Sequence, residues 1–370
     1  MEHSVIYRDP DAYSPWPVLW PLPDGSIGAG VVTSPIGSHP GASTFGRFLA
    51  MASRDGGRTW QPSDHPAHPA NWPFGTADEH MDRFAVVLPD PGGDTFLTVG
   101  AHGFEAWDAG RLDEARSQHR WVRPLPERPA QIAVQSPVLI SRRSTDGGRT
   151  WDVREWEVPG AQGFWCFNRG VVMHDGTLVV SVYTHDHDGD ERPYVLRSED
   201  AGRRWRLHDL CAKAKGVPAN ETALCEVSPG RLIALTRSDA GRGDHHLLQM
   251  WSDDGGRTWT EPIKTPIWGH PAHLLKLADG RILCTHGYRR PPMGVRAVLS
   301  EDGGETWDVA GTVVLRDDST GHSPHRGEGT GVGDVGYPVS MQLPDGDILT
   351  AYYVTPADNV THSAATRWRL

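Results

Sequence analysis

One octapeptide pattern recurs along this chain and constrains its fold more than any other feature. The pattern is Ser-x-Asp-x-Gly-x-x-Trp, and it contains five of the fifteen tryptophans. Its copies are SRDGGRTW (53–60), STDGGRTW (144–151), SEDAGRRW (198–205), SDDGGRTW (252–259) and SEDGGETW (300–307). Recurrence at such spacing is typical of folds that repeat one small structural unit. We therefore expect a chain built from repeated units.

The residue types of the octapeptide predict a tight turn between two strands. Asp-Gly and Gly-Gly favour hairpin turns because glycine tolerates a positive φ angle. The aspartate can accept hydrogen bonds from backbone amides of its own turn. The tryptophan is expected to bury its ring beneath the turn, where its indole N–H needs an acceptor. Each octapeptide is thus interpreted as the turn that stabilises one hairpin, with a structural role.

A second repeat, an apolar strand followed by a turn and another apolar strand, lies between the octapeptides. The turns of its six copies fall at Asp24, Asp90, Asp175, Pro229, Asp279 and Asp345. An inner hairpin followed by an outer hairpin with the octapeptide turn makes a unit of four strands, which is the blade of a β-propeller. The contents of glycine (42) and proline (30) agree with many short strands joined by turns.

These repeats predict an all-β fold, a six-bladed β-propeller of four-stranded antiparallel blades, in which residues 1–370 form a single domain. Six inner hairpins accompany only five octapeptides, so one blade is incomplete. The N-terminal segment HSVIYRD has no hairpin of its own, and we expect it to supply the outermost strand of the last blade, which removes a free edge. The insertions 60–84 and 103–131 are expected to form loops over one face.

The inner hairpins also predict where functional residues gather, because the innermost strands of a propeller begin near its central axis. Counting eight residues back from each inner turn gives equivalent positions, at Trp16, Asp82, Phe167, Glu221, Pro271 and Tyr337. Arg237 follows in the second strand of the fourth hairpin and is expected at the same end as Glu221. Tyr337, two blades further along, should face them across the axis.

The octapeptides resemble the Asp boxes of the sialidase (neuraminidase) superfamily, and this resemblance covers the whole chain. NETALCEVSPGRLIALTRS resembles the sialidase segment with a conserved glutamate and a substrate-binding arginine, which implies these roles for Glu221 and Arg237. GYPVSMQLPDG resembles the segment with the tyrosine nucleophile, here Tyr337. YRRPPMGVRAVLSEDGG resembles the segment with a further substrate-binding arginine; Arg290 fits the spacing best, and Arg289 is its rival.

The resemblance implies an exo-glycosidase that hydrolyses a terminal acidic sugar. A carboxylate nucleophile would be repelled by an anionic substrate, whereas a neutral phenol such as that of Tyr337 is not. The phenol needs a base, which Glu221 supplies. Arginines can bind the carboxylate of the substrate with two hydrogen bonds.

Two features of the family are missing from the sequence. Sialidases begin their first blade with a motif that contains a third arginine, but SPWPVLW (14–20) has none; Arg8 and Arg169 are candidate replacements. The loop before the first octapeptide, where sialidases have an acidic aspartate, contains neither Asp nor Glu. The candidates for the general acid are His39 in that loop and Asp82 at the entry to the second blade.

These departures keep two other functions open. The first is a polysaccharide lyase that acts on uronic-acid-containing glycans with tyrosine and histidine as acid and base, which the many histidines and the missing acid favour. The second is a propeller that binds glycans without catalysis, since a fold does not determine a function.

Composition excludes several other classes of protein. The net charge of −11 argues against nucleic acid or an anionic membrane as a partner. The N-terminus has no visible signal peptide and no stretch of 18 apolar residues occurs, so a cytoplasmic protein is expected. The four cysteines form no CxxC pair, and the HxH of His185 and His187 lies in a polar loop, so we expect no metal or other cofactor. The expected partner is an acidic glycan; the oligomeric state stays open.

Overall fold

The computed structural model describes residues 1–35, 37, 39–73, 83–87, 93–159, 161–166, 170–185, 191–210, 219–238, 245–320 and 333–370. Antiparallel strands dominate these residues. The helical segments among them are short: α1 (His39–Phe45), α2 (Leu112–Ser117) and the 3-10 turns η1 (Pro69–Asn71) and η2 (Ala109–Arg111). No described helix is long and apolar enough to cross a membrane. The fold is all-β, as the repeats predict.

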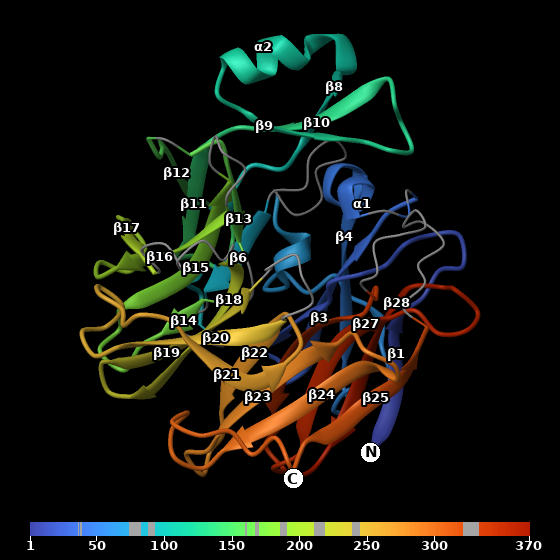
Figure 1. Cartoon of the computed structure of the whole chain (residues 1–370), viewed down its shortest axis with the longest axis vertical. Coiled ribbons are helices and arrows are strands. Elements are labelled where there is room, and N and C mark those ends of the chain that lie inside the picture. The colour runs from blue at the N-terminus through green and yellow to red at the C-terminus, as the bar shows by residue number, and fades with distance from the viewer. Residues whose placement is uncertain are drawn as a thin grey trace.

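Six sheets of four or five strands follow one another along the described chain (Figure 1). The first contains β2 (Val18–Pro21), β3 (Ile27–Thr33), β4 (Arg47–Ser53) and β5 (Gln61–Pro62). The second contains β6 (Arg83–Val87), β7 (Phe96–Ala101), β11 (Val138–Ser144) and β12 (Asp152–Glu157). The third contains β13 (Gly163–Cys166), β14 (Val171–Val172), β15 (Leu178–His185), β16 (Glu191–Ser198) and β17 (Arg206–Asp209).

The remaining three sheets complete the series. The fourth contains β18 (Ala219–Ser228), β19 (Arg231–Ser238), β20 (His246–Ser252) and β21 (Ile263–Trp268). The fifth contains β22 (Ala272–Lys276), β23 (Ile282–Tyr288), β24 (Met293–Ser300) and β25 (Val313–Ser319). The sixth contains β26 (Gly336–Gln342), β27 (Ile348–Val354), β28 (His362–Trp368) and β1 (Glu2–Tyr7).

The hydrophobic core lies between neighbouring sheets, and apolar side chains form a cluster at each interface. Because the inner strands are covered on both faces, they are nearly continuous apolar runs, as in β27. Pairs from successive interfaces, beginning with the first and second sheets and ending with the sixth and first, are Trp20 and Phe96, Leu139 and Val180, Val195 and Leu232, Ile233 and Cys284, Val295 and Tyr352, and Leu349 and Val31. Each sheet therefore packs against two others, and the last sheet packs against the first.

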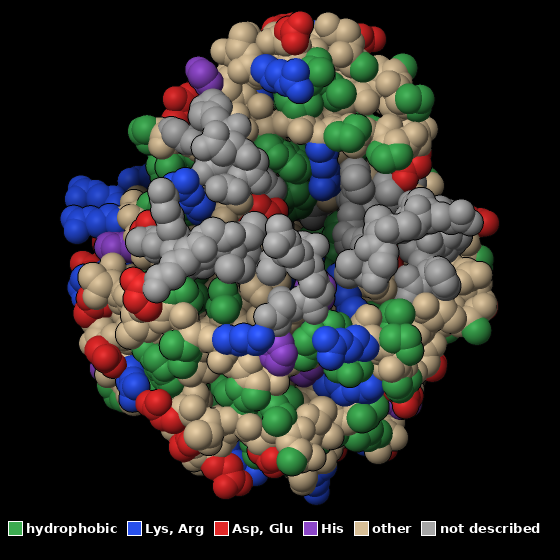
Figure 2. All heavy atoms as spheres, in the orientation of Figure 1, with side chains coloured by type: hydrophobic (Ala, Val, Ile, Leu, Met, Phe, Trp, Pro, Cys, Tyr) green, Lys and Arg blue, Asp and Glu red, His purple; other side chains and the backbone are tan. Residues whose placement is uncertain are grey.

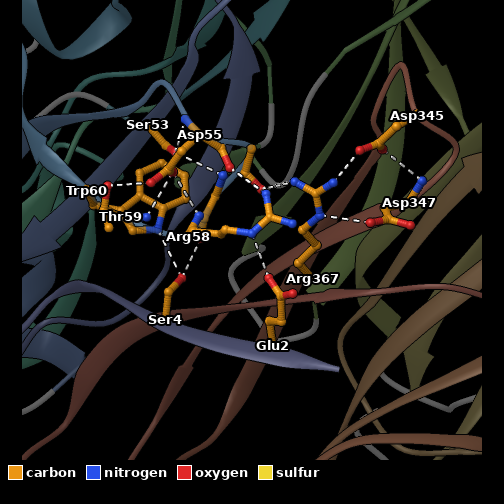
Figure 3. A network of polar contacts seen from close by, with 12 residues as sticks. Glu2, Ser4, Ser53, Asp55, Arg58, Thr59, Trp60, Asp345, Asp347 and Arg367 are labelled. Carbon is orange, nitrogen blue, oxygen red and sulfur yellow. Dashed lines mark hydrogen bonds and ion pairs between the residues drawn. The ribbon is translucent and has the colours of Figure 1, made fainter.

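The N-terminal strand completes the sixth sheet, which confirms the prediction made from HSVIYRD. β1 pairs antiparallel with β28, with Val5 opposite Ala364. A polar network at this point joins the sixth sheet to the first octapeptide turn (Figure 3). Ser4 donates to the carbonyl of Gly57 at 2.6 Å and accepts from the indole N–H of Trp60 at 3.1 Å. The first and last sheets are thus held together by polar contacts as well as by apolar packing.

Arg367 contributes a second part of this network. Its side chain is buried, and its Nε donates to Asp347 at 2.8 Å. One of its Nη atoms pairs with Asp345, and the other donates to the carbonyl of Gly56 at 3.3 Å (Figure 3). A single guanidinium therefore bridges β28, the β26–β27 turn and the first octapeptide.

We expect Arg367→Ala to lower the free energy of unfolding by about 2 kcal/mol, because it removes the guanidinium that pairs with Asp345 and with the carbonyl of Gly56 in a partly buried site, although Asp347 keeps its pairing with Arg369. Urea denaturation would measure the change. Arg8→Ala is the matched control: Arg8 pairs with Asp358 at the exposed surface, and its loss should cost less than about 1 kcal/mol. Equal losses in the two variants would contradict a special role for Arg367 at the junction.

The octapeptide turns form as their residue types predict. In the second copy, Asp146 accepts from the amides of Arg149 and Thr150 at 3.0 Å and from the hydroxyl of Thr150 at 2.6 Å. These hydrogen bonds, that of the Thr150 hydroxyl first, lower the pKa of Asp146 to about 2. The indole N–H finds an acceptor in three copies and has none among the described residues in the other two, at Trp205 and Trp259.

The insertion 103–131 is not the set of loops that the sequence predicts. It contains β8 (Glu105–Asp108), η2, α2 and β9 (Trp121–Pro124), and together with β10 (Gln131–Gln135) it makes a three-stranded sheet in the order β8–β10–β9. Figure 1 shows this unit at one end of the molecule, beyond the second sheet. Ala115 of α2 packs with Trp107, Ile132 and Val134 in a small core of its own. The polar composition of the insertion hides this short apolar pattern.

Candidate active site

Tyr337 and Glu221 meet although 116 residues separate them in the chain: the phenol O–H of Tyr337 donates to Oε1 of Glu221. The carboxylate is almost fully buried, with 6% of the side chain exposed, whereas Tyr337 is half-buried. Each residue lies near the start of an innermost strand, β18 or β26, where the pairing register shifts. Such irregularities turn side chains out of the normal alternation of a strand, so these two can face one another.

The backbone at Tyr337 is unusual in a second way. Tyr337 and Trp16, which occupy equivalent positions in the sixth and first hairpins, have positive φ angles of 51° and 57°. Residues other than glycine rarely adopt this region, and they cluster at functional sites where the surroundings enforce it. The two rings lie 6.2 Å apart, centroid to centroid. Trp16 therefore stands beside the tyrosine, in the segment where the resemblance predicts a third arginine at position 15 or 16.

Arg237 forms a hydrogen bond with the second carboxylate oxygen of Glu221. It projects from β19, the strand paired with β18, and its Nη1 donates to Oε2 at 2.8 Å. Its side chain is only 14% exposed. One oxygen of the Glu221 carboxylate thus accepts a hydrogen bond from the phenol and the other accepts one from the guanidinium, in a site largely removed from water. Asn220 fixes the chain beneath it, because its Oδ1 accepts the amide N–H of Glu221 at 2.6 Å.

These surroundings keep the phenol protonated. Withdrawal of the phenol from water, followed by the negative charge of Glu221, raises the pKa of Tyr337 above its ordinary value. The charges of Arg237 and Arg289 act in the opposite direction and do not cancel the increase. A neutral phenol hydrogen-bonded to a carboxylate is the arrangement that general-base activation of a nucleophile requires.

The structure distinguishes the two rival arginines. The spacing of the sequence favours Arg290, but the guanidinium of Arg290 is exposed and stacks over Trp268 at 3.8 Å from the ring centroid. Arg289 is buried, and its Nε donates at 3.1 Å to the carbonyl of Val335, two residues before Tyr337. Its Nη2 is buried without a hydrogen-bond partner in the described part of the chain. Arg289, rather than Arg290, is therefore the arginine on the side of Tyr337.

Close approach of two backbones places Arg289 there. A Cβ atom on Gly287, which lies in β23, would come within 2.6 Å of the carbonyl oxygen of His270 and 3.1 Å of the Cα of Gly336. Only glycine fits at position 287, so the fifth and sixth sheets can approach closely at their inner ends. Arg289 follows Gly287 by two residues, and Tyr337 directly follows Gly336, so this close approach brings the two side chains near one another.

His270 is a residue that sequence reasoning did not assign to the site. It is 1% exposed, its ring lies 4.7 Å from that of His245, and neither of its ring nitrogens has a hydrogen-bond partner among the described residues. Burial, followed by the charges of Arg237 and Arg289, lowers its pKa well below the ordinary value, so the imidazole is neutral. The signal in the sequence was its place next to Pro271, the equivalent of Glu221 and Tyr337 in the fifth hairpin.

Tyr183 of β15 is a second residue that the sequence did not indicate. It is 9% exposed, and burial, followed by the charges of Glu221 and Glu191, raises its pKa well above the ordinary value. Tyr337 and Arg237 also act on this pKa, so Tyr183 lies in the same electrostatic environment as the central pair.

The other predicted residues are not brought to this site by the described structure. Asp82 and Arg169 lie outside the described residues, and His39 begins α1 with only its backbone described. Arg8, considered as a replacement for the third arginine, instead pairs with Asp358 at the surface. No group of three His, Cys, Asp or Glu side chains suited to a metal ion occurs among the described residues.

Comparisons with known proteins concern the family and the fold of the chain. Residues 124–350 match the family described as the BNR repeat-like domain. A sialidase of Bacteroides fragilis is 26% identical over 219 residues, which cover 56% of this chain and 36% of the relative. The chain spans about a third of the length of the curated relatives it matches.

Solved structures share the fold over nearly the whole chain. A protein of unknown function from Dyadobacter fermentans has a TM-score of 0.76 at 24% identity, with 100% of this chain and 98% of that chain covered. A Hadza microbial sialidase has a TM-score of 0.62 at 21% identity, with 97% of this chain and 66% of that chain covered.

Proposed function

Because the chain belongs to the BNR repeat-like family of the sialidase superfamily, we propose that it is a glycoside hydrolase that removes a terminal acidic sugar, sialic acid or a related one, from a glycan. The observation that carries this proposal is the hydrogen bond from Tyr337 to Glu221 beside Arg237. We further propose that the six sheets are the blades of a six-bladed propeller formed by residues 1–370 as one domain. The cluster of apolar side chains at every sheet interface supports this.

The proposed reaction proceeds in two steps. In the first, the phenolic oxygen of Tyr337 attacks the anomeric carbon while its proton passes to Glu221, and the bond from that carbon to the leaving oxygen breaks. The leaving oxygen takes a proton from a general acid, for which His39 and Asp82 stay the candidates. In the second step, water attacks the anomeric carbon and gives a proton to the deprotonated general acid. The bond from that carbon to the tyrosine oxygen breaks, and the tyrosine oxygen regains its proton from Glu221. The sugar leaves with retained configuration.

The arginines would select the acidic sugar. Arg237 and Arg289 both act on the pKa of Tyr337, and Nη2 of Arg289, which has no hydrogen-bond partner among the described residues, can donate to a carboxylate of the substrate. A buried arginine N–H has lost its hydrogen bond to water, and the carboxylate of an acidic sugar can accept a hydrogen bond from it instead. Such a donor therefore favours the binding of an anionic sugar. Trp16 in place of a third arginine would leave part of the sugar against an apolar ring.

The proposal is tested by incubating the protein with nitrophenyl glycosides of sialic acid, glucuronic acid and galactose. We expect release of nitrophenol from at least one acidic glycoside and none from galactoside, and proton NMR should show retention at the anomeric carbon. Inversion, or release from the neutral sugar alone, would contradict the proposed mechanism.

A second candidate, elimination from a uronic acid, is favoured by one observation. His270 is a neutral imidazole near two arginines, and a neutral base beside a neutralised carboxylate is what removal of the proton next to that carboxylate requires. The same incubation with a uronic-acid polymer distinguishes the two: elimination gives an unsaturated product that absorbs in the ultraviolet, and hydrolysis does not. Binding without any product would identify a non-catalytic glycan-binding protein.

A further inference from the structure

A row of aromatic side chains leads from the central pair toward the insertion. Tyr183 and Trp165 are directly opposite one another on β15 and β13, and their rings are almost parallel, with centroids 6.3 Å apart. Trp121, the first residue of β9, follows with its ring edge-on to Trp165 at 5.9 Å. Phe104 packs behind both tryptophans, at 5.1 Å from each.

The two tryptophans of this row are partly exposed, whereas Phe104 is fully buried beneath them. The guanidinium of Arg123 lies 5.0 to 5.3 Å from the rings of Phe104, Trp121 and Trp165. Figure 2 shows the surface hollowed below the insertion, with hydrophobic and Lys or Arg side chains at its edge. The aromatic row is therefore a partly exposed apolar surface with a positive charge beside it.

The insertion is anchored so that this row has a defined geometry. The side-chain amide of Gln135, at the end of β10, donates to the carbonyls of His102 and Phe164 and accepts from the amide of Phe164. Gln135 thus pairs with β13 as a short piece of strand would. A Cβ on Gly163 would lie 3.1 Å from the Cβ of Trp121, so the insertion packs directly on the backbone of β13.

The direction of the row indicates what it binds. One end, Tyr183, lies near Glu221 and Tyr337, and the other end, Trp121, belongs to the insertion. A terminal sugar held by Arg237 and Arg289 would occupy the inner end, and the next sugar units can then extend along the row. The C–H faces of a pyranose ring pack well on flat aromatic rings, which lose their hydration on contact.

We propose that Tyr183, Trp165 and Trp121 form a platform for the sugar units on the leaving-group side of the bond that is cleaved. The inference rests on the proposed glycosidase function and adds that the substrate is an oligosaccharide rather than a free or minimally substituted acidic sugar. The positive charge of Arg123, beside Trp121 and Trp165, gives the platform a preference for glycans with an acidic group there.

The test compares two substrates that share their acidic sugar. One is the glycosyl fluoride, which has no sugar on the leaving-group side, and the other is a trisaccharide that ends in the same acidic sugar. We expect Trp121→Leu to lower the ratio of kcat/KM on the trisaccharide to kcat/KM on the fluoride by roughly tenfold. Trp121→Phe, which keeps a ring, should lower this ratio less.

Trp259→Leu is the matched control, because Trp259 is a half-buried tryptophan of the fourth octapeptide, away from the row. In this variant the ratio of the two kcat/KM values should equal that of the wild type. Thermal unfolding verifies that each variant is folded. An unchanged ratio in Trp121→Leu would overturn the platform while leaving the glycosidase function intact. If no variant or wild type hydrolyses either substrate, calorimetric binding of the trisaccharide decides: weaker binding to Trp121→Leu than to Trp259→Leu supports the platform without hydrolysis, and equal binding overturns it.

Discussion

Tyr337→Phe is expected to lower kcat on an acidic nitrophenyl glycoside by about 10³-fold or more, because it removes the only oxygen that can attack the anomeric carbon in the proposed mechanism. The phenylalanine ring can keep the contacts with Trp16 and Tyr353, whose ring centroids lie 6.2 and 5.8 Å away. The fold should therefore survive, and circular dichroism and thermal unfolding would verify this. Release of nitrophenol under substrate saturation measures the effect.

Tyr288→Phe is the control for this experiment. Tyr288 is a half-buried tyrosine in β23 whose ring packs on Trp268, and its hydroxyl plays no part in the proposed chemistry. It should retain the wild-type rate. A Tyr337→Phe protein that keeps most of its activity would reject tyrosine as the nucleophile, and the elimination mechanism with His270 as base would then be the one to test.

Short-range chemistry explains why much of this fold is predictable from the sequence. The octapeptide forms its turn from its own atoms, as the hydrogen bonds to Asp146 demonstrate, so it can be identified wherever it occurs. Each inner hairpin has its turn at the same distance from the start of its first strand, which makes Glu221 and Tyr337 equivalent by simple counting. That count anticipates their convergence, although their positions in the chain differ by 116.

Long-range packing explains what the sequence did not reveal. Arg289 and Arg290 are neighbours with the same chemistry, and the choice between them depends on Gly287 and on the approach of two sheets. His270 and Tyr183 join the site through the packing of separate sheets. Only His270 has a signal in the sequence, its place next to Pro271, and no local pattern marks Tyr183. The insertion has the composition of a loop because its strands are short and its polar residues outnumber the apolar ones that form its small core.

Glu221→Gln provides the sharpest test of how the nucleophile is activated. Glutamine has the shape of glutamate, and its carbonyl oxygen can still accept from Nη1 of Arg237, which donates to Glu221 at 2.8 Å. Its amide cannot take a proton from the phenol. We expect kcat to fall by about 10²- to 10⁴-fold, which is the usual contribution of a general base. A variant with the wild-type kcat would show that Glu221 does not act as the base.

The pH dependence of this variant follows from the raised pKa of Tyr337. A phenol with its ordinary pKa of about 10 would become increasingly ionised between pH 7 and pH 10, and alkali would then replace the missing base. Since burial holds the pKa of Tyr337 above that value, raising the pH should restore little activity to Glu221→Gln.

Incorporation of 3,5-difluorotyrosine at position 337 lowers the pKa of the phenol. In the Glu221→Gln background it should restore part of the rate, with a gain that grows as the pH rises. The same fluorinated tyrosine beside an intact Glu221 is the control, where the carboxylate already takes the proton and no such gain is expected. If fluorination fails to rescue Glu221→Gln at any pH, the carboxylate orients Tyr337 or balances the charge of Arg237 rather than removing the proton.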